Sequence, residues 1–153
     1  MYSVLIFTSC NTYKETSVLP ANEIKTDAIE NSSLYNSTIT TGCYFMNIEK
    51  DSAMANFLVN NKNVSGKLEY KRFQKDSNTG HFAGTMDSSK INGWYTFQSE
   101  GMISVRQVIF KIHGNTFSEG YGDIELKGDT AYFAYPHTLN YEVNHPFQKV
   151  ICN

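Results

Sequence analysis

The segment KINGWYTFQSEGMISVRQVIFKI, residues 90–112, decides the fold class. Apolar residues or glycine occupy the odd positions from 91 to 97, and apolar residues occupy the even positions from 108 to 112. A period of two is typical of a β-strand with one buried face. Ser99-Glu100-Gly101, between the two halves, has the composition of a tight turn. The segment therefore predicts two consecutive strands joined by a short connection.

The same alternation extends in both directions from this segment. Turn signals rich in Asn, Asp, Ser and Gly separate the apolar-patterned stretches at steady intervals. The expected strands are residues 43–49, 52–59, 64–73, 80–87, 90–98, 102–112, 116–126, 130–135 and 147–152. Short connections favour an antiparallel up-and-down meander of about eight to ten strands. Because closure removes exposed edges, we expect an all-β, lipocalin-like barrel.

Composition restricts the class of protein. The chain has 153 residues, which fits one domain, and 41% of them are hydrophobic, too many for a disordered chain. The net charge is −2 and no Lys/Arg cluster occurs, so the sequence gives no electrostatic case for nucleic-acid binding. No apolar run reaches the 18 or so residues of a membrane-spanning helix.

The N-terminal region has a different character from the rest. Residues 4–7 resemble the tail of a signal-peptide apolar region, and Thr8-Ser9-Cys10 resembles a lipobox. The basic start of such a peptide is missing, which a misplaced start codon would explain. We therefore expect a partial signal peptide and lipobox at 1–10, a disordered, flexible tether at 11–41, and a β-barrel domain at 42–153. A secreted soluble protein, or a frayed strand with a chance cysteine, are the alternatives.

The three cysteines have separate expected uses. Cys43 lies in the first strand of the domain and Cys152 in the last, and these strands are neighbours in a closed barrel. A disulfide between them would close a loop of 109 residues, contributing about 4–5 kcal/mol on the chain-entropy model, and would require an oxidising compartment. The alternative is a pair of reduced, buried thiols. Cys10 is left to carry the lipid.

One polar cluster is the candidate site inside the barrel. Arg106 shares its parity with Val108, so its side chain should point toward the core and needs a carboxylate partner. Glu100 and Glu119 are the available partners. The cluster could orient the polar group of a ligand, but an ion pair that plugs one end of the barrel and fixes register is favoured. The members of the cluster are Ser99, Glu100, Ser104, Arg106 and Glu119.

Aromatic residues fall on nearly every expected strand, and so many bulky side chains favour a packed interior over a ligand pocket. On the outer face, Trp94, Tyr121 and Tyr135 are candidates for an exposed patch that binds a partner. The four histidines lack metal-ligand spacing, and no nucleophile elbow or phosphate loop occurs. We therefore expect no enzyme activity, no catalytic residue, no metal and no cofactor.

A family resemblance over about residues 42–152 is carried by four motifs, which are Gly42-Cys43-Tyr44, Tyr95-Thr96-Phe97-Gln98-Ser99-Glu100-Gly101, Glu119-Gly120-Tyr121-Gly122 and the terminal Lys149-Val150-Ile151-Cys152. The chain resembles small, uncharacterised lipoproteins of Bacteroidetes-type bacteria, and the resemblance implies a lipid-anchored β-domain without a known reaction. A weaker, architectural similarity to lipocalins rests on Gly42-Cys43-Tyr44 in the first strand.

These observations predict a cell-envelope lipoprotein that acts as a structural, interaction or binding module. Asn11 after Cys10 is unlike an inner-membrane retention signal, so the expected location is the outer membrane, with the lipid as the membrane contact. The expected partner is a small apolar ligand, a glycan or an envelope protein. A lipocalin-like carrier of a small ligand and a carboxylate-dependent hydrolase are the alternative functions.

Both cysteine assignments are tested by the intact mass of the mature protein. We expect the mass of a diacylglycerol and an acyl chain on Cys10, together with the loss of two hydrogens from Cys43 and Cys152. An unmodified full-length mass with three free thiols would contradict both assignments.

Overall fold

The computed structural model describes residues 39–99 and 101–152, and within these ranges all regular structure is β-strand. Apolar and polar residues alternate in the sequence, and successive side chains of a strand point to opposite faces. The strand conformation therefore lets each of these segments bury its apolar face. The strands are β1 (Gly42–Ile48), β2 (Asp51–Asn60), β3 (Asn63–Lys71), β4 (Asn78–Met86), β5 (Lys90–Ser99), β6 (Met102–His113), β7 (Thr116–Tyr121), β8 (Ile124–Lys127), β9 (Thr130–Phe133), β10 (Asn140–Tyr141) and β11 (Gln148–Val150).

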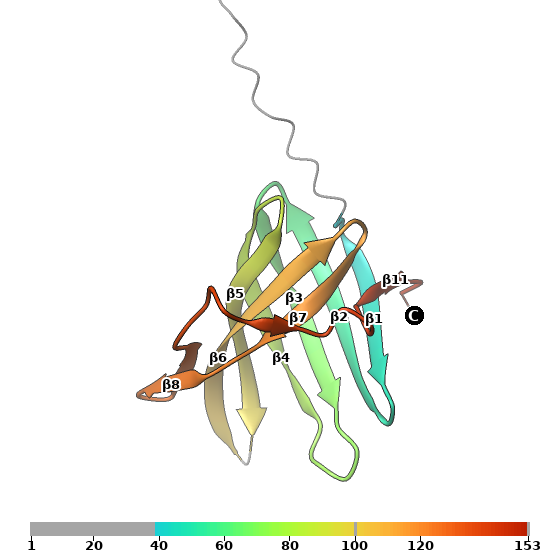
Figure 1. Cartoon of the computed structure of the whole chain (residues 1–153). Coiled ribbons are helices and arrows are strands. Elements are labelled where there is room, and N and C mark those ends of the chain that lie inside the picture. The colour runs from blue at the N-terminus through green and yellow to red at the C-terminus, as the bar shows by residue number, and fades with distance from the viewer. Residues whose placement is uncertain (1–38, 100, 153) are drawn as a thin grey trace, which may run out of the picture. The chain divides into compact units, whose positions relative to one another are not determined.

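Strands β1 to β7 are an antiparallel meander, as predicted. Each pairs with the next along the chain, and the order across the sheet is β10-β7-β6-β5-β4-β3-β2-β1-β11. Figure 1 shows the long strands curling around a shared interior. The all-β class and the meander are therefore confirmed.

The sheet is not closed, so the prediction of a closed barrel is wrong. Its ends are β10 and β11, which follow one another in the chain and do not pair together. In the segment between β10 and β11, the backbone pairs with β7 at one isolated bridge, between Phe117 and Phe147. Its two N···O distances are 3.3 and 2.7 Å. Residues 142–146, between β10 and this bridge, belong to no strand, so no continuous ladder joins β7 to β11.

The prediction of one strand over 116–126 is also wrong, because the strand is interrupted at Gly122-Asp123. Strand β7 ends before the break, and β8 after it pairs only with β9. Strand β9 then pairs with the first half of β6 in a parallel orientation, at Val105–Thr130. Strand β6 thus has β7 beside its second half and β9 beside its first half, a pairing that an up-and-down meander lacks.

Close backbone contact between β4 and β5 lets the sheet curl. Gly84 lies opposite Gly93, and a Cβ atom added to either would come within 2.6 Å of the Cα atom of the other. Real side chains do not tolerate such a distance, so glycine is required where the two strands approach on the inner face.

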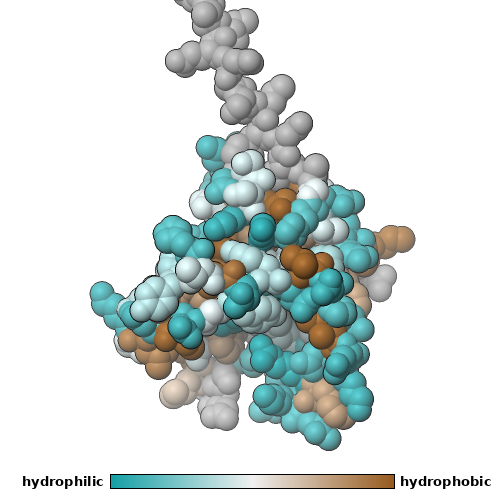
Figure 2. All heavy atoms as spheres, in the orientation of Figure 1, coloured by the Kyte–Doolittle hydropathy of each residue, from teal (hydrophilic) through white to brown (hydrophobic). Residues whose placement is uncertain are grey.

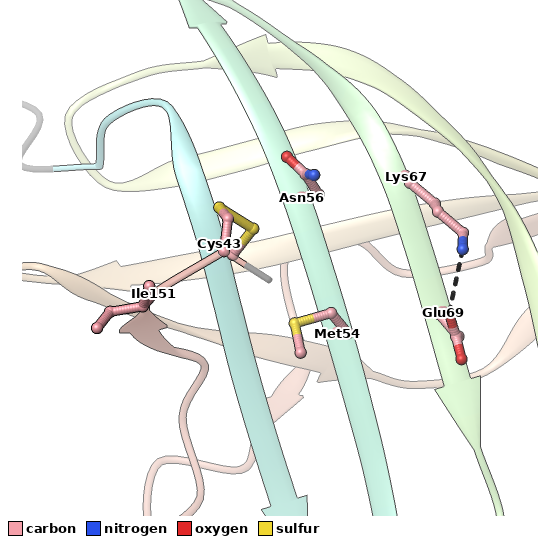
Figure 3. A pocket seen from close by; sticks show the side chains of 7 residues that line it. Cys43, Met54, Asn56, Lys67, Glu69 and Ile151 are labelled. Atoms are coloured by element: carbon pink, nitrogen blue, oxygen red, sulfur yellow. Dashed lines mark hydrogen bonds and ion pairs between the residues drawn. A yellow bond between two sulfur atoms is a disulfide. The ribbon is translucent and has the colours of Figure 1, made fainter.

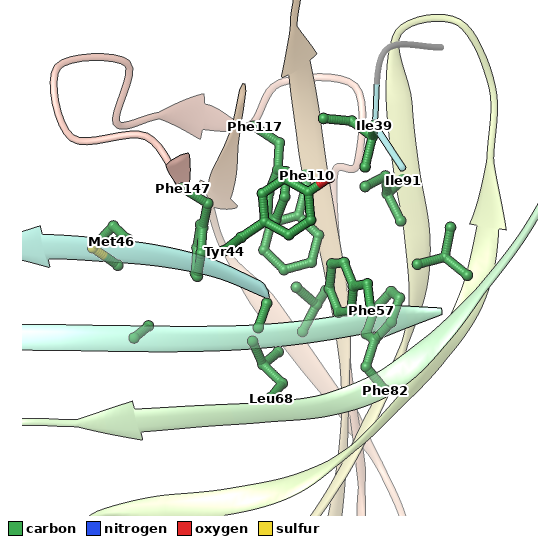
Figure 4. Packing of buried hydrophobic residues seen from close by; sticks show 14 of the residues in the cluster. Ile39, Tyr44, Met46, Phe57, Leu68, Phe82, Ile91, Phe110, Phe117 and Phe147 are labelled. Atoms are coloured by element: carbon green, nitrogen blue, oxygen red, sulfur yellow. The ribbon is translucent and has the colours of Figure 1, made fainter. Parts of the chain in front are cut away.

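Aromatic side chains fill the interior of the curled sheet (Figure 4). Six of those that are at most 1% exposed form one cluster, in which the ring centroids of contacting pairs lie 4.9–6.4 Å apart, within the range of favourable aromatic pairs. Phe117 stacks on Phe147 at 4.9 Å, so the same two residues share a backbone bridge and a ring contact. The six residues are Tyr44, Phe57, Phe82, Phe110, Phe117 and Phe147.

The end of the predicted tether packs on the domain. Ile39 is 2% exposed and belongs to the core. The Tyr44 hydroxyl donates to the Thr40 carbonyl at 2.6 Å, and the Thr41 hydroxyl accepts from the Val59 amide at 2.9 Å. Ordered packing thus extends to three residues before the expected boundary at 42. The remainder of the expected tether, and Cys10, lie outside the described residues.

The Cys43–Cys152 disulfide is present, as predicted, with a Cα–Cα distance of 5.3 Å. Strand β11 pairs with β1 at Cys43–Val150, which brings Cys152 alongside β1. The first and last strands are therefore neighbours without closure of the whole sheet.

Candidate functional site

The predicted polar cluster contains an ion pair between Arg106 of β6, which is 27% exposed, and a buried carboxylate of β7. The Arg106 Nη1 atom lies 3.0 Å from Glu119 Oε1, and the Glu119 side chain is only 3% exposed. The Tyr70 hydroxyl donates a hydrogen bond of 2.8 Å to Glu119 Oε2. Both oxygens of this buried carboxylate therefore have a partner, as a charge in an apolar interior requires.

Two tyrosine rings cover the Arg106 guanidinium. Its Cζ atom lies 4.9 Å from the ring centroid of Tyr70 and 5.4 Å from that of Tyr95, within cation–π range. Tyr95 is directly opposite Arg106 in the β5–β6 ladder, so strand register sets this contact. The cluster is held from three sides by β3, β5 and β7.

Burial and charge act together on the titration of these groups. Burial alone would lower the pKa of Arg106, but the facing Glu119 carboxylate raises that pKa above its usual range. Burial and then Glu119 raise the pKa of Tyr70 well above the ordinary tyrosine value. Burial raises the pKa of Tyr95 to about 12, against the opposing effect of Arg106. The cluster thus keeps Arg106 charged and both tyrosines neutral at neutral pH.

The structure brings together two of the five residues predicted for the cluster, Arg106 and Glu119. Ser104 is half-buried on the same face of β6 as Arg106, and Ser99 is backbone-paired with Met102. Glu100 lies outside the described residues. Sequence reasoning missed Tyr70 and Tyr95 as members, although their inward parity was visible, because contacts between distant strands depend on how the sheet curls.

A shallow pocket of about 200 Å³ adjoins the cluster at the same end of the sheet. It shares Tyr70 with the cluster, and Arg72 adds a cation. Tyr121, another lining residue, is 44% exposed, and its partial burial raises its pKa to about 12. The residues that line this end pocket are Met46, Ile48, Asp51, Ser52, Tyr70, Arg72 and Tyr121.

A second candidate site lies on the outer face of β11, β1, β2 and β3, and we call it the outer-face site. Phe45 and Met54 pair directly across β1 and β2, and each is 38% exposed. Three shallow pockets of about 190, 120 and 210 Å³ lie around them, and Phe45, Met54 or both line each one. Sequence reasoning missed this site, yet the run Tyr44-Phe45-Met46 signals it, because three successive apolar residues cannot all face inward.

The disulfide forms one wall of the outer-face site, and charged residues form the opposite rim (Figure 3). Lys67 and Lys71 lie 3.3 and 3.2 Å from Glu69, and hydrogen bonds from Lys71 and then Lys67 lower the pKa of Glu69. Ile151, beside the disulfide, is 89% exposed. The site therefore combines an apolar centre with a charged rim.

The three residues of the predicted aromatic patch come from different elements. Trp94 is on the outer face of β5 and Tyr121 lines the end pocket, while Tyr135 follows β9. All three are exposed, at 44%, 44% and 64%. Figure 2 shows hydrophobic side chains in separate small groups on the face in view.

Among the described residues, no group of three or more His, Cys, Asp or Glu side chains is placed to hold a metal ion. The same part of the chain contains no helix that could cross a membrane. Comparison with protein-family models, curated proteins and solved structures finds no match to this chain.

Replacing Arg106 by alanine should destabilise the domain. The change leaves Glu119 buried without its cation, so we expect the free energy of unfolding to fall by about 3 kcal/mol. Adding Glu119→Gln should recover part of the loss, because the unpaired charge is then removed. Urea denaturation of both variants measures the effect. An Arg106→Ala variant with an unchanged melting temperature would contradict a structural role.

Proposed function

We propose that this chain is a lipid-anchored, non-enzymatic interaction module of the bacterial cell envelope. Its anchor is Cys10, its expected location is the outer membrane, and its partner surface is the outer-face site. The partner best suited to that surface is an envelope protein.

The filled interior is the observation that carries this proposal. Phe57, Phe82 and Phe110 are completely buried and contact one another where a lipocalin-like carrier needs space for its ligand. An interior ligand would have to displace such rings from close packing. Recognition at the surface requires no such rearrangement, so the outer face is the better-supported place for binding.

The outer-face site suits a protein partner better than a small molecule. Each of its three pockets has about 210 Å³ or less, whereas sites for small ligands are typically about 300–1,000 Å³. Its apolar centre at Phe45 and Met54, with Lys67, Glu69 and Lys71 at the rim, follows the usual arrangement of a protein interface.

The disulfide supports the envelope location. Disulfides form and persist in oxidising compartments outside the cytoplasm, and Cys43–Cys152 joins the first strand to the segment just after the last strand. The Thr8-Ser9-Cys10 motif and the resemblance to small envelope lipoproteins support the same location.

The alternative functions have weaker support. A small-ligand carrier would have to use the shallow end pocket of about 200 Å³, because the adjoining interior is packed. A carboxylate-dependent hydrolase would need a carboxylate that is free to act on a substrate, and Glu119 is tied to Arg106 and Tyr70.

Site-specific photocrosslinking tests the proposed surface. A photoreactive amino acid replaces Phe45 at the outer-face site, or Thr96 on the outer face of β5 as a matched exposed control. In cells that produce the protein, we expect a discrete crosslinked species from position 45 that position 96 does not give. No adduct at position 45, or the same adducts from both positions, would contradict the proposal.

A further inference from the structure

Strand β8 presents a backbone edge that has no strand partner within residues 39–99 and 101–152. All four residues of β8 are exposed, with Ile124 at 61% and Leu126 at 74%. Figure 1 shows the β8–β9 hairpin projecting away from the long strands. An exposed strand edge of this kind is a template for pairing with another strand.

One hydrogen bond determines which backbone groups point toward this free edge. The Ala134 amide donates to the Asp123 carbonyl at 2.9 Å, next to the β8–β9 ladder. Hydrogen-bonded and non-hydrogen-bonded pairs alternate in an antiparallel ladder. The backbone N–H and C=O groups of residues 123, 125 and 127 therefore point toward β9. The N–H and C=O groups of Ile124 and Leu126 therefore point outward, toward the free edge.

The charges of β8 select one register for pairing with a second copy of itself. Self-pairing of Leu126 places Glu125 opposite Lys127 of the other copy, and symmetry forms this pair twice. Pairing Ile124 with Leu126 of the other copy places the two Glu125 residues opposite each other. Self-pairing of Ile124 places Glu125 opposite Asp123. Directly opposed like charges destabilise a sheet, so only the register centred on Leu126 is complementary.

We propose that two copies of this chain associate through β8, in antiparallel orientation about a two-fold axis at Leu126. The two Leu126 residues exchange backbone hydrogen bonds, and their side chains meet on one face of the joined sheet. The two Glu125–Lys127 pairs lie on the other face, where the Tyr132 hydroxyl already donates to Glu125 at 2.9 Å. The contact is isologous and closes at two copies.

The size of the contact predicts weak association. A four-residue edge buries much less surface than the 1,200–2,000 Å² or so of a stable protein interface. The dimer should therefore form in a concentration-dependent way in solution.

Sedimentation velocity of the full chain, carrying Cys10→Ser to prevent intermolecular disulfides, tests this dimer. We expect a monomer–dimer equilibrium that shifts to dimer as the concentration rises. Glu125→Lys or Lys127→Glu should each weaken the dimer by about tenfold or more, because both ion pairs become like-charge pairs. The double variant Glu125→Lys/Lys127→Glu should restore the dimer, because the charges are again complementary.

Two further variants complete the test. Leu126→Pro removes an N–H group that points away from β9, so the variant should keep its near-ultraviolet circular dichroism and lose the dimer. Asp76→Lys makes the same charge change as Glu125→Lys, in the loop between β3 and β4, and should dimerise normally. A wild-type chain that is monomeric at every concentration would overturn the proposal. So would single variants that dimerise normally, or a double variant that does not recover.

Discussion

The structure depends on the aromatic packing that joins β7 to the segment just before β11 in an open sheet. Phe117 of β7 stacks on Phe147, the residue before β11, and their backbones form a single bridge. Phe110 contacts both rings from β6. Without a continuous ladder between β7 and β11, these buried rings, together with the Cys43–Cys152 disulfide, hold the last segment of the chain against the first strand.

The same packing restricts where function can lie. The rings that hold the sheet occupy its interior, and the Arg106–Glu119–Tyr70 cluster fills the space near one end. Among the described residues, the outer face around Phe45 and the exposed edge of β8 remain open for recognition. These are different surfaces, so binding of a partner at one and pairing of two copies at the other are compatible.

Much of the fold follows from the sequence, because alternation in strands β1 to β6 marks one buried face over long stretches. The ion pair between Arg106 and Glu119 follows from the same parity, since an inward arginine needs a carboxylate. The path of the chain after Tyr121 could not be predicted from the sequence, because the alternation of apolar and polar residues continues through Gly122 while the chain leaves the sheet. Parallel pairing of β9 with β6, and a two-residue β10, have no period-two signal of their own. The disulfide was predicted correctly even though the sheet is not closed, because it needs only β1 and β11 to be neighbours.

A titration with a naturally fluorescent fatty acid tests the central claim, that the interior is filled and binding occurs at the surface. We expect no saturable one-to-one binding to the native domain, because Phe57, Phe82 and Phe110 occupy the space. Saturable one-to-one binding that persists in a Phe45→Lys variant and disappears when Phe82→Trp adds volume to the interior would contradict the account.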